Sequence, residues 1–238
     1  IRIIKFLLKM SKCEQCIVRQ LNSLGELTKD ELLRISGCKS SNIVKKGEIL
    51  FDEGQHINGV FCIKDGVCKV TKMGSNGREQ IVKLVKKGDL LGERSLVSEE
   101  VSNLKATAIN DMEVCFIPKE EIVRDLKSNT NFTMSILKEM AISLKEADNV
   151  IVDMAQKTVK QRLAETLLHL NKTYGSENLE KPLDIQLSRD DIASIIGTAT
   201  ESAIRLLSSF KKEKYIHLKG KEIYILNPKK LQQIAEGF

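Results

Sequence analysis

The sequence predicts an α+β protein in which an antiparallel β-roll is followed by one long helix and by a small C-terminal domain of helices and a hairpin. Three observations support this order. Eight of the 14 glycines lie between residues 47 and 92, and residues 119–174 contain neither glycine nor proline. Near the end of the chain, two short helix patterns precede two short strand patterns.

The glycine-rich part is typical of short antiparallel strands. Runs of β-branched and aromatic residues alternate with glycines, which indicates a roll or barrel. Asp65-Gly66 separates two of these runs and is a hairpin signal. The predicted strands cover residues 49–51, 60–63, 67–71, 80–85 and 112–117.

Composition narrows the class of protein. The 238 residues are 42% hydrophobic and 29% charged, which excludes collagen-like, mucin-like and membrane-bundle chains. No apolar run approaches the roughly 18–20 residues that span a bilayer, so we expect no membrane partner. The apolar run at residues 3–8 is too short for a signal peptide, and Met10 is a candidate start. We therefore expect the six cysteines in the reducing cytoplasm, where structural disulfides are rare.

The stretch without glycine or proline predicts a helix that begins after Pro118 and restarts at Asn131, following a polar run. Its apolar residues recur every three or four positions, which is the spacing of a coiled-coil seam. A core helix of a single domain has the same spacing, but we predict the helix of a parallel homodimer. The seam residues are Leu137, Met140, Leu144, Ala147, Ile151 and Met154.

The last third predicts two short helices joined by a tight turn, which is the pattern of a helix-turn-helix. Ser188 is an expected N-cap, because acidic residues follow it in the first turn. Gly197 ends this helix, and residues 198–201 (Thr-Ala-Thr-Glu) predict a second capping box. Two packed helices of any small α domain would give the same pattern.

The second of these helices has one apolar face and one face suited to reading DNA bases. Residues of the apolar face recur at i, i+3, i+4 and i+7, and they are Ala203, Leu206, Leu207 and Phe210. The opposite face carries Thr200, Glu201, Ile204 and Arg205 near the helix N-terminus, the part that reaches base edges. Arginine binds guanine through two hydrogen bonds, glutamate accepts from cytosine, and an apolar side chain contacts the thymine methyl group. The structural alternative is an i,i+4 ion pair between Glu201 and Arg205.

Positive charge gathers after this helix. Between residues 202 and 230, eight basic and two acidic residues give a net charge of +6, equal to that of the whole chain. Residues 215–218 and 222–225 predict a hairpin with a basic tip, which makes the domain a winged helix-turn-helix. Basic residues there suit phosphate contacts, which supply affinity without sequence information. The residues that we assign to the DNA backbone are Ser188, Arg189, Thr198, Lys219 and Lys221.

These features resemble the CRP/FNR family of bacterial transcription regulators from about residue 21 to residue 231. The matching stretches read KGEILFDEG at 46–54, KDG at 64–66, KGDLLGE at 87–93 and LSRDDIA at 187–193. The resemblance implies a cyclic-nucleotide-binding-type roll, a dimerisation helix and a domain that binds double-stranded DNA, with RNA polymerase as a partner. It also places Glu201 and Arg205 at positions that read a G·C pair in half-sites beginning TTG. Ile204 stands where the FNR-type helix has a serine.

We therefore predict four segments along the chain. They are an N-terminal cysteine-containing segment at 1–20, a sensor roll at 21–118, a dimerisation helix at 119–157 and a DNA-binding domain at 158–238.

The predicted sensor roll lacks part of the cyclic-AMP-binding pattern known from the family that it resembles. Cyclic-AMP binders hold the ribose with a glutamate after a glycine, and Gly92-Glu93 matches that position. The Arg-Ser pair that binds the cyclic phosphate should follow about ten residues later, but residues 99–104 contain no arginine. A buried phosphate without a guanidinium is unfavourable. We expect that cyclic AMP is not the ligand and that Glu93 has a structural role.

The cysteines leave three interpretations open. FNR-type sensors bind a [4Fe–4S] cluster through three N-terminal cysteines and one in the roll, and Cys13, Cys16 and Cys115 match three of those positions. The third N-terminal cysteine is absent, and Cys38 is the nearest substitute. The two other cysteines, predicted in strands, are Cys62 and Cys68. A cluster, another thiol or metal sensor, and purely structural cysteines are all compatible with this pattern, so the cofactor stays unknown.

We predict that the chain is not an enzyme, because it has no serine nucleophile motif and no phosphate-binding glycine loop. The alternative function is a cytoplasmic thiol or redox signalling module whose C-terminal domain binds a protein partner and not DNA. The Cys13-x-x-Cys16 motif lacks the βαβ context of a thioredoxin-type enzyme.

Overall fold

The computed structural model describes residues 13–176, 178 and 181–238, which divide into two compact units. The first unit comprises the described residues up to Lys72 together with Lys83–Leu144, and the second comprises Met73–Val82 together with Lys145–Phe238. The predictions about a start at Met10 and about a signal peptide lie outside the described residues. Within the described ranges, no helix is long and apolar enough to cross a membrane.

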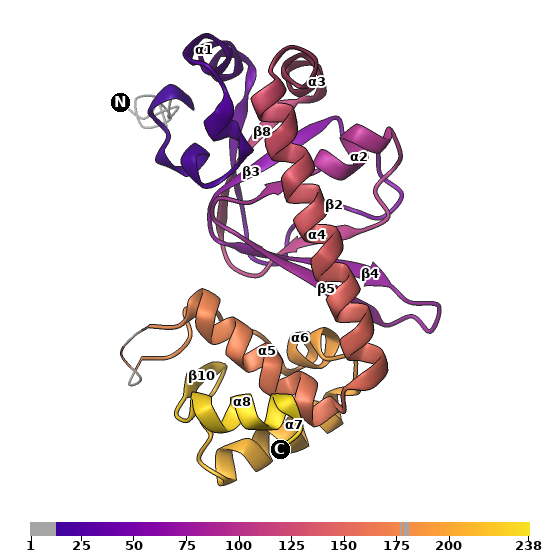
Figure 1. The fold of residues 1–238 in the computed structure, drawn as a ribbon, viewed down its shortest axis with the longest axis vertical. Coiled ribbons are helices and arrows are strands. Elements are labelled where there is room, and N and C mark those ends of the chain that lie inside the picture. Colours follow the sequence, from indigo (N-terminus) through magenta and orange to yellow (C-terminus); the bar gives the residue numbers. More distant parts are fainter. Residues whose placement is uncertain (1–12, 177, 179–180) are drawn as a thin grey trace, which may run out of the picture. The chain divides into compact units, whose positions relative to one another are not determined.

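An antiparallel β-roll of two four-stranded sheets makes up most of the first unit (Figure 1). One sheet has the order β1-β8-β3-β6 and the other has the order β2-β7-β4-β5. The pairings described in both sheets are antiparallel, which confirms the predicted roll. The strands are β1 (Ser40–Val44), β2 (Ile49–Phe51), β3 (Gly59–Asp65), β4 (Val67–Met73), β5 (Glu79–Lys86), β6 (Leu90–Leu91), β7 (Lys105–Ala108) and β8 (Met112–Pro118).

The sheet that contains β3 and β8 has a hydrophobic core on each face, because successive strand residues point to opposite sides. Ile63 and Val114 belong to the core inside the roll, with Cys68 of β4. Their neighbours Cys62 and Cys115 belong to the core on the other face, beneath the N-terminal segments. Because side chains alternate between the two faces of a strand, Cys62 and Cys115 lie in the outer core, apart from Cys68 inside the roll.

Short helices cover this outer face. Three 3-10 turns begin the described chain, at Cys13–Gln15, Ile17–Leu21 and Ser23–Glu26. They are followed by α1 (Lys29–Cys38), which Thr28 caps, and α2 (Glu93–Ser98) comes later in the roll. The last two helices of this part of the chain are α3 (Lys119–Ser128) and α4 (Thr130–Gln156).

The helix predicted from Pro118 onward is broken at Asn129, and it restarts at Thr130 and not at Asn131 as expected. Asn129 has an extended backbone, and its side-chain oxygen accepts a hydrogen bond from the Phe132 backbone at 3.0 Å. Its side-chain amide donates to the Glu26 carbonyl and to Glu31. Asparagine competes well for backbone hydrogen bonds, so this residue ends one helix and starts the next.

The second unit contains α5 (Val159–Tyr174), α6 (Arg189–Ile195), α7 (Thr200–Lys212), the strands β9 (Ile216–Lys219) and β10 (Glu222–Ile225), and α8 (Pro228–Glu236). The strands β9 and β10 pair as an antiparallel hairpin. Buried side chains from several of these elements form its interior, and they include Leu163, Leu167, Ile192, Leu207 and Phe210.

An ion-pair cluster joins α1 to α3, which lie beside each other in Figure 1. Arg34 of α1 pairs with Glu121 at 2.6 Å and also with Asp125, whose side chain is fully buried. Burial raises the pKa of Asp125, although Arg34 opposes this effect. Removing the cation would leave a buried carboxylate without its counter-charge, which is a costly arrangement.

We expect Arg34→Ala to lower the free energy of unfolding by about 2–3 kcal/mol, below the range for a fully buried pair because Arg34 is partly exposed. An acid whose folded-state pKa is raised binds its proton more tightly in the folded state, so acid stabilises the folded form. The difference from wild type should therefore be smaller at mildly acidic pH than at neutral pH. Urea unfolding, monitored by circular dichroism at each pH, measures this difference in the free energy of unfolding. Arg124→Ala is the control, because Arg124 touches the same Glu121 from an exposed position. An equal loss at both pH values would contradict the assigned role of Asp125.

Candidate DNA-reading helix and cysteine pocket

The turn between α6 and α7 has the form of a helix-turn-helix. The Ser188 hydroxyl accepts a hydrogen bond from the Asp191 backbone at 3.0 Å, and the Asp191 side chain accepts from the Ser188 backbone. This capping box confirms the predicted start of α6. Gly197 has φ +63°, a left-handed conformation that glycine adopts without strain.

The capping box predicted for α7 is wrong. The N-cap residue is Ala199, which has no side-chain oxygen to accept a hydrogen bond from the helix. Thr200 lies inside the helix instead and donates a hydrogen bond to Asp190 at 2.7 Å. This contact joins the first turns of α6 and α7, so it fixes the two helices relative to each other.

The two faces of α7 divide as the sequence predicts. Ala203, Leu207 and Phe210 are fully buried, and Leu206 lies half-buried at the edge of this face. On the other face Glu201 and Arg205 are exposed, and Ile204 keeps 43% of its surface exposed. Residues on this face also include Thr200 and Ser208. In the described part of the chain, Arg205 forms no ion pair with Glu201, so its guanidinium is available to a ligand.

A basic hairpin tip follows α7. Lys219 is 76% exposed, with the carboxylate of Glu222 4.0 Å away, and Lys221 is exposed at the other side of the turn. Arg189 of α6 donates a hydrogen bond to the Gly220 carbonyl at 2.9 Å, and burial lowers its pKa. Arg189 therefore contacts the hairpin from within the domain, whereas Lys219 and Lys221 project into solvent.

Four of the six cysteines line one small cavity in the first unit. Its volume is about 20 Å³, and its cysteines are Cys13, Cys16, Cys62 and Cys115. Cys13, Cys16 and Cys115 are the cysteines that match FNR-type ligand positions, whereas Cys62 is predicted from the sequence only as a strand residue. Cys38 lies outside the cavity, exposed at the end of α1, and burial raises its pKa. Among the described residues, no group of three or more histidine, cysteine or acidic side chains is arranged to hold a single metal ion.

Basic side chains surround this cavity, since Arg19, Lys39 and Lys64 also line it. The Lys39 amine lies 3.9 Å from the Cys115 sulfur, and only 6% of Lys39 is exposed. Burial lowers the pKa of Lys39, but interaction with the sulfurs of Cys115 and Cys13 outweighs burial and raises the pKa. Sequence reasoning did not select Lys39 or Cys62, because only the fold brings them to the matched cysteines.

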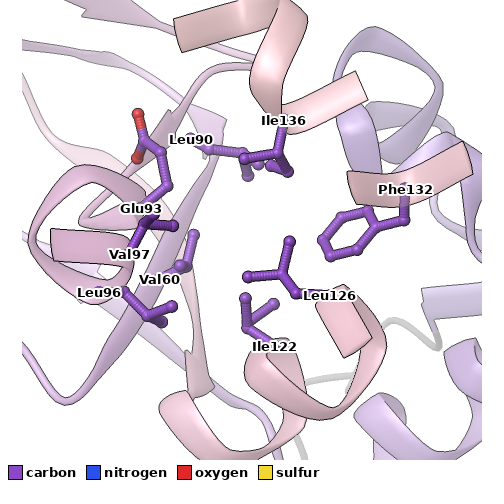
Figure 2. Close-up of a pocket in the computed structure, with 9 residues that line it drawn as sticks. All are labelled: Val60, Leu90, Glu93, Leu96, Val97, Ile122, Leu126, Phe132 and Ile136. Carbon is purple, nitrogen blue, oxygen red and sulfur yellow. The ribbon is translucent and has the colours of Figure 1, made fainter. Parts of the chain in front are cut away.

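Glu93, the match to the ribose-binding position, lies at the edge of a different cavity (Figure 2). Apolar side chains from two strands and from α2, α3 and α4 point into this space, and the Glu93 carboxylate points away from them. The volume is about 10 Å³, room for about one water molecule. Burial raises the pKa of Glu93 to about 7.

Comparisons with known proteins agree with this arrangement. A model of the cyclic nucleotide-binding domain matches residues 42–129, and a model of the Crp-like helix-turn-helix domain matches residues 161–234. The fumarate and nitrate reduction regulatory protein of Vibrio cholerae is 28% identical over 94% of this chain and 90% of that protein. The transcriptional activator protein Anr of Pseudomonas protegens is 25% identical over 93% of this chain and 89% of its own length.

Two solved structures share the fold. FixK2 from Bradyrhizobium japonicum superposes with a TM-score of 0.74 at 22% identity, covering 82% of this chain and 96% of its own. A transcriptional regulator of the CRP/FNR family from Eubacterium rectale gives a TM-score of 0.73 at 20% identity, covering 90% and 97%.

A roll of the cyclic-nucleotide-binding type, followed by a long helix and a helix-turn-helix, defines a DNA-binding transcription regulator with a sensor domain. Nothing in the comparisons supports the alternative in which the C-terminal domain binds a protein and not DNA. The chain belongs to the CRP/FNR family of transcription regulators.

We expect Ser188→Ala to destabilise the second unit by about 1 kcal/mol, because α6 loses its N-cap. Ser188→Asn should retain most of that stability, since asparagine caps equally well. Thermal unfolding in the absence of DNA measures both variants. If both variants lost the same stability, the serine would act through some contact other than the cap.

Proposed function

We propose that this chain binds twofold-symmetric promoter DNA as a homodimer, with half-sites containing TTG or a close relative and centred about one helical turn apart. The observation that carries the proposal is the exposed pair Glu201 and Arg205 on α7, which the basic hairpin tip follows along the chain. Arg205 would bind guanine and Glu201 the paired cytosine, with Thr200 and Ile204 at neighbouring bases.

Residues around the recognition helix are suited to hold the DNA backbone. Lys219 and Lys221 project from the hairpin tip, where each can neutralise a phosphate. Ser188 and Thr198 lie at the beginnings of the two helices, where backbone N–H groups favour phosphate oxygens. Arg189 would act at this surface mainly by positioning the hairpin, through its bond to Gly220.

The homodimer proposal rests on the apolar face of α4. Leu137, Leu144 and Ile151 are 50%, 65% and 66% exposed, although they are large apolar residues. Ala147 is exposed as well, and Met140 and Met154 are half-buried. Because these six positions follow the heptad spacing, a second copy of α4 would cover them together. RNA polymerase is the further partner that family membership suggests.

For the sensor, we infer that the cysteine pocket and not the cyclic-nucleotide position takes up the signal. Cys13, Cys16 and Cys115 would hold an iron–sulfur cluster, which binds proteins through cysteine thiolates. Buried thiols next to the Lys39 cation fit that group, because cluster and thiolates together are anionic. The cavity is smaller than a cluster, so loading would displace the 3-10 turns that cover it. A cluster of this kind requires the reducing cytoplasm that we also propose.

We expect Arg205→Ala to cost about 1–3 kcal/mol of binding free energy on the preferred duplex and to relax preference at one base pair. Lys219→Ala should weaken binding to every sequence about equally, because it removes only a phosphate contact. Fluorescence anisotropy on matched and scrambled duplexes at several salt concentrations measures both variants. If Arg205→Ala weakened both duplexes alike, Arg205 would not read a base.

We expect Leu144→Asp and Ile151→Asp to produce monomers, because each would place two like charges in an apolar interface. Specific DNA binding should fall with dimerisation, since one half-site gives too little affinity. Sedimentation velocity measures the state of assembly. Ile142→Asp is the matched control, because Ile142 is an exposed apolar residue of α4 outside the seam. An intact dimer in both seam variants would place the interface elsewhere.

A further inference from the structure

We propose that Cys62 of β3 takes the place of the missing N-terminal cysteine, so that Cys13, Cys16, Cys62 and Cys115 together form the thiolate set for an iron–sulfur cluster. This inference rests on the proposed function of the cysteine pocket and goes beyond it, because it assigns the fourth ligand. The choice lies between Cys62 and Cys38, since Cys68 belongs to the core inside the roll.

The register of the sheet places Cys62 beside a matched cysteine. In the antiparallel pairing of β3 with β8, Cys62 is the direct partner of Cys115. Side chains of directly opposed residues lie on the same face, with their Cβ atoms roughly 4.5–5.5 Å apart. Both thiols therefore face the N-terminal segment, and both line the cavity with Cys13 and Cys16.

Cys38 has the opposite surroundings. It ends α1, its thiol lies 3.5 Å from the carbonyl oxygens of Arg34 and Ile35, and it is exposed. Its closeness in sequence to Cys16 therefore does not bring it into the cavity. Cys62 lies at the cavity although it comes 46 positions after Cys16 in the sequence.

Burial raises the pKa of the Cys62 thiol to about 12, and a hydrogen bond from Asn22 opposes this effect. The Asn22 side-chain amide lies 3.5 Å from the Cys62 sulfur and donates a second hydrogen bond to the Gly88 carbonyl at 2.8 Å. The second bond fixes the amide, so its N–H groups point to predetermined acceptors. Hydrogen bonds to the sulfurs are among the features by which proteins tune iron–sulfur clusters.

The arrangement favours a cluster over a single zinc ion. Zinc in a structural site needs four ligand atoms around one point, each about 2.3 Å from the metal when the ligand is sulfur. No such group exists among the described residues, although four thiols line one cavity. A four-iron cluster offers a separate iron atom to each thiolate, so its ligands need not converge on one point.

The test is anaerobic reconstitution of the full chain with ferrous iron and sulfide, followed by assays of bound iron and sulfide and by the absorbance near about 400 nm that thiolate-ligated clusters give. Cys62→Ser and Cys62→Ala should bring bound iron and absorbance down to the background of an unloaded chain. Cys115→Ser should do the same. Cys38→Ser should load like the wild type.

Cys68→Ala is the matched control, because Cys68 is also a buried cysteine of a roll strand but belongs to the other core. It should keep full loading, and circular dichroism should show that the Cys62 variants fold. Retention of the cluster in folded Cys62→Ala, or its loss in Cys38→Ser, would overturn the assignment of Cys62. If a Cys62 variant does not fold, the loading of Cys38→Ser still shows whether Cys38 is the fourth ligand.

Three further outcomes would refute the cluster itself, whereas loss of the assignment alone leaves a wild-type chain that still binds iron. A wild-type chain that takes up no iron would refute the cluster itself, and the assignment of Cys62 with it. A chain that binds one zinc ion, or that forms a Cys62–Cys115 disulfide on exposure to oxygen without ever binding iron, would also overturn it. Mass spectrometry of the native chain and of its peptides identifies both products.

Discussion

The pairing of β3 with β8 is the interaction on which the first unit depends. These strands lie at the centre of their sheet, between β1 and β6. Their alternating residues supply both hydrophobic cores, one inside the roll and one beneath α1 and the 3-10 turns. A slip of one residue between the strands would exchange the two faces. It would move Cys115 away from Lys39 and bury Val114 among the N-terminal turns.

The same pairing explains why the charges of the cysteine pocket are tolerated. Lys39 follows directly after α1 and precedes β1, which pairs with β8. The Ser41 hydroxyl lies 3.4 Å from the Cys115 sulfur, so this thiol has polar neighbours on two sides. A lysine is almost never fully buried unless it is paired. The Cys115 sulfur lies 3.9 Å from the ammonium of Lys39, and the apolar core beside the cavity supplies packing.

The roll, the long helix and the winged domain could be predicted from the sequence, because glycine spacing, heptad spacing and capping residues are local signals. β1 and β7 were missed since their residues are polar or small, as Ser40 and Ala106 show, and only pairing with a neighbour makes them strands. The break at Asn129 depends on its side-chain bond to the Glu26 carbonyl, about one hundred residues away. Cys62 was missed for the same kind of reason, because its contact with Cys115 exists only once β3 and β8 pair.

Two hydrogen bonds connect the third 3-10 turn, which follows the cysteine-containing segment, to α4. Ser23, fully buried in the third 3-10 turn, donates a hydrogen bond to Glu139 at 2.8 Å and accepts one from Ser135 at 2.9 Å. Both partners lie on α4, within ten residues before the exposed Leu144. Where binding at one site changes the affinity at another, the coupling free energy is reciprocal. If the proposed cluster strengthened the proposed pairing of two α4 helices, that pairing would strengthen binding of the cluster by the same free energy.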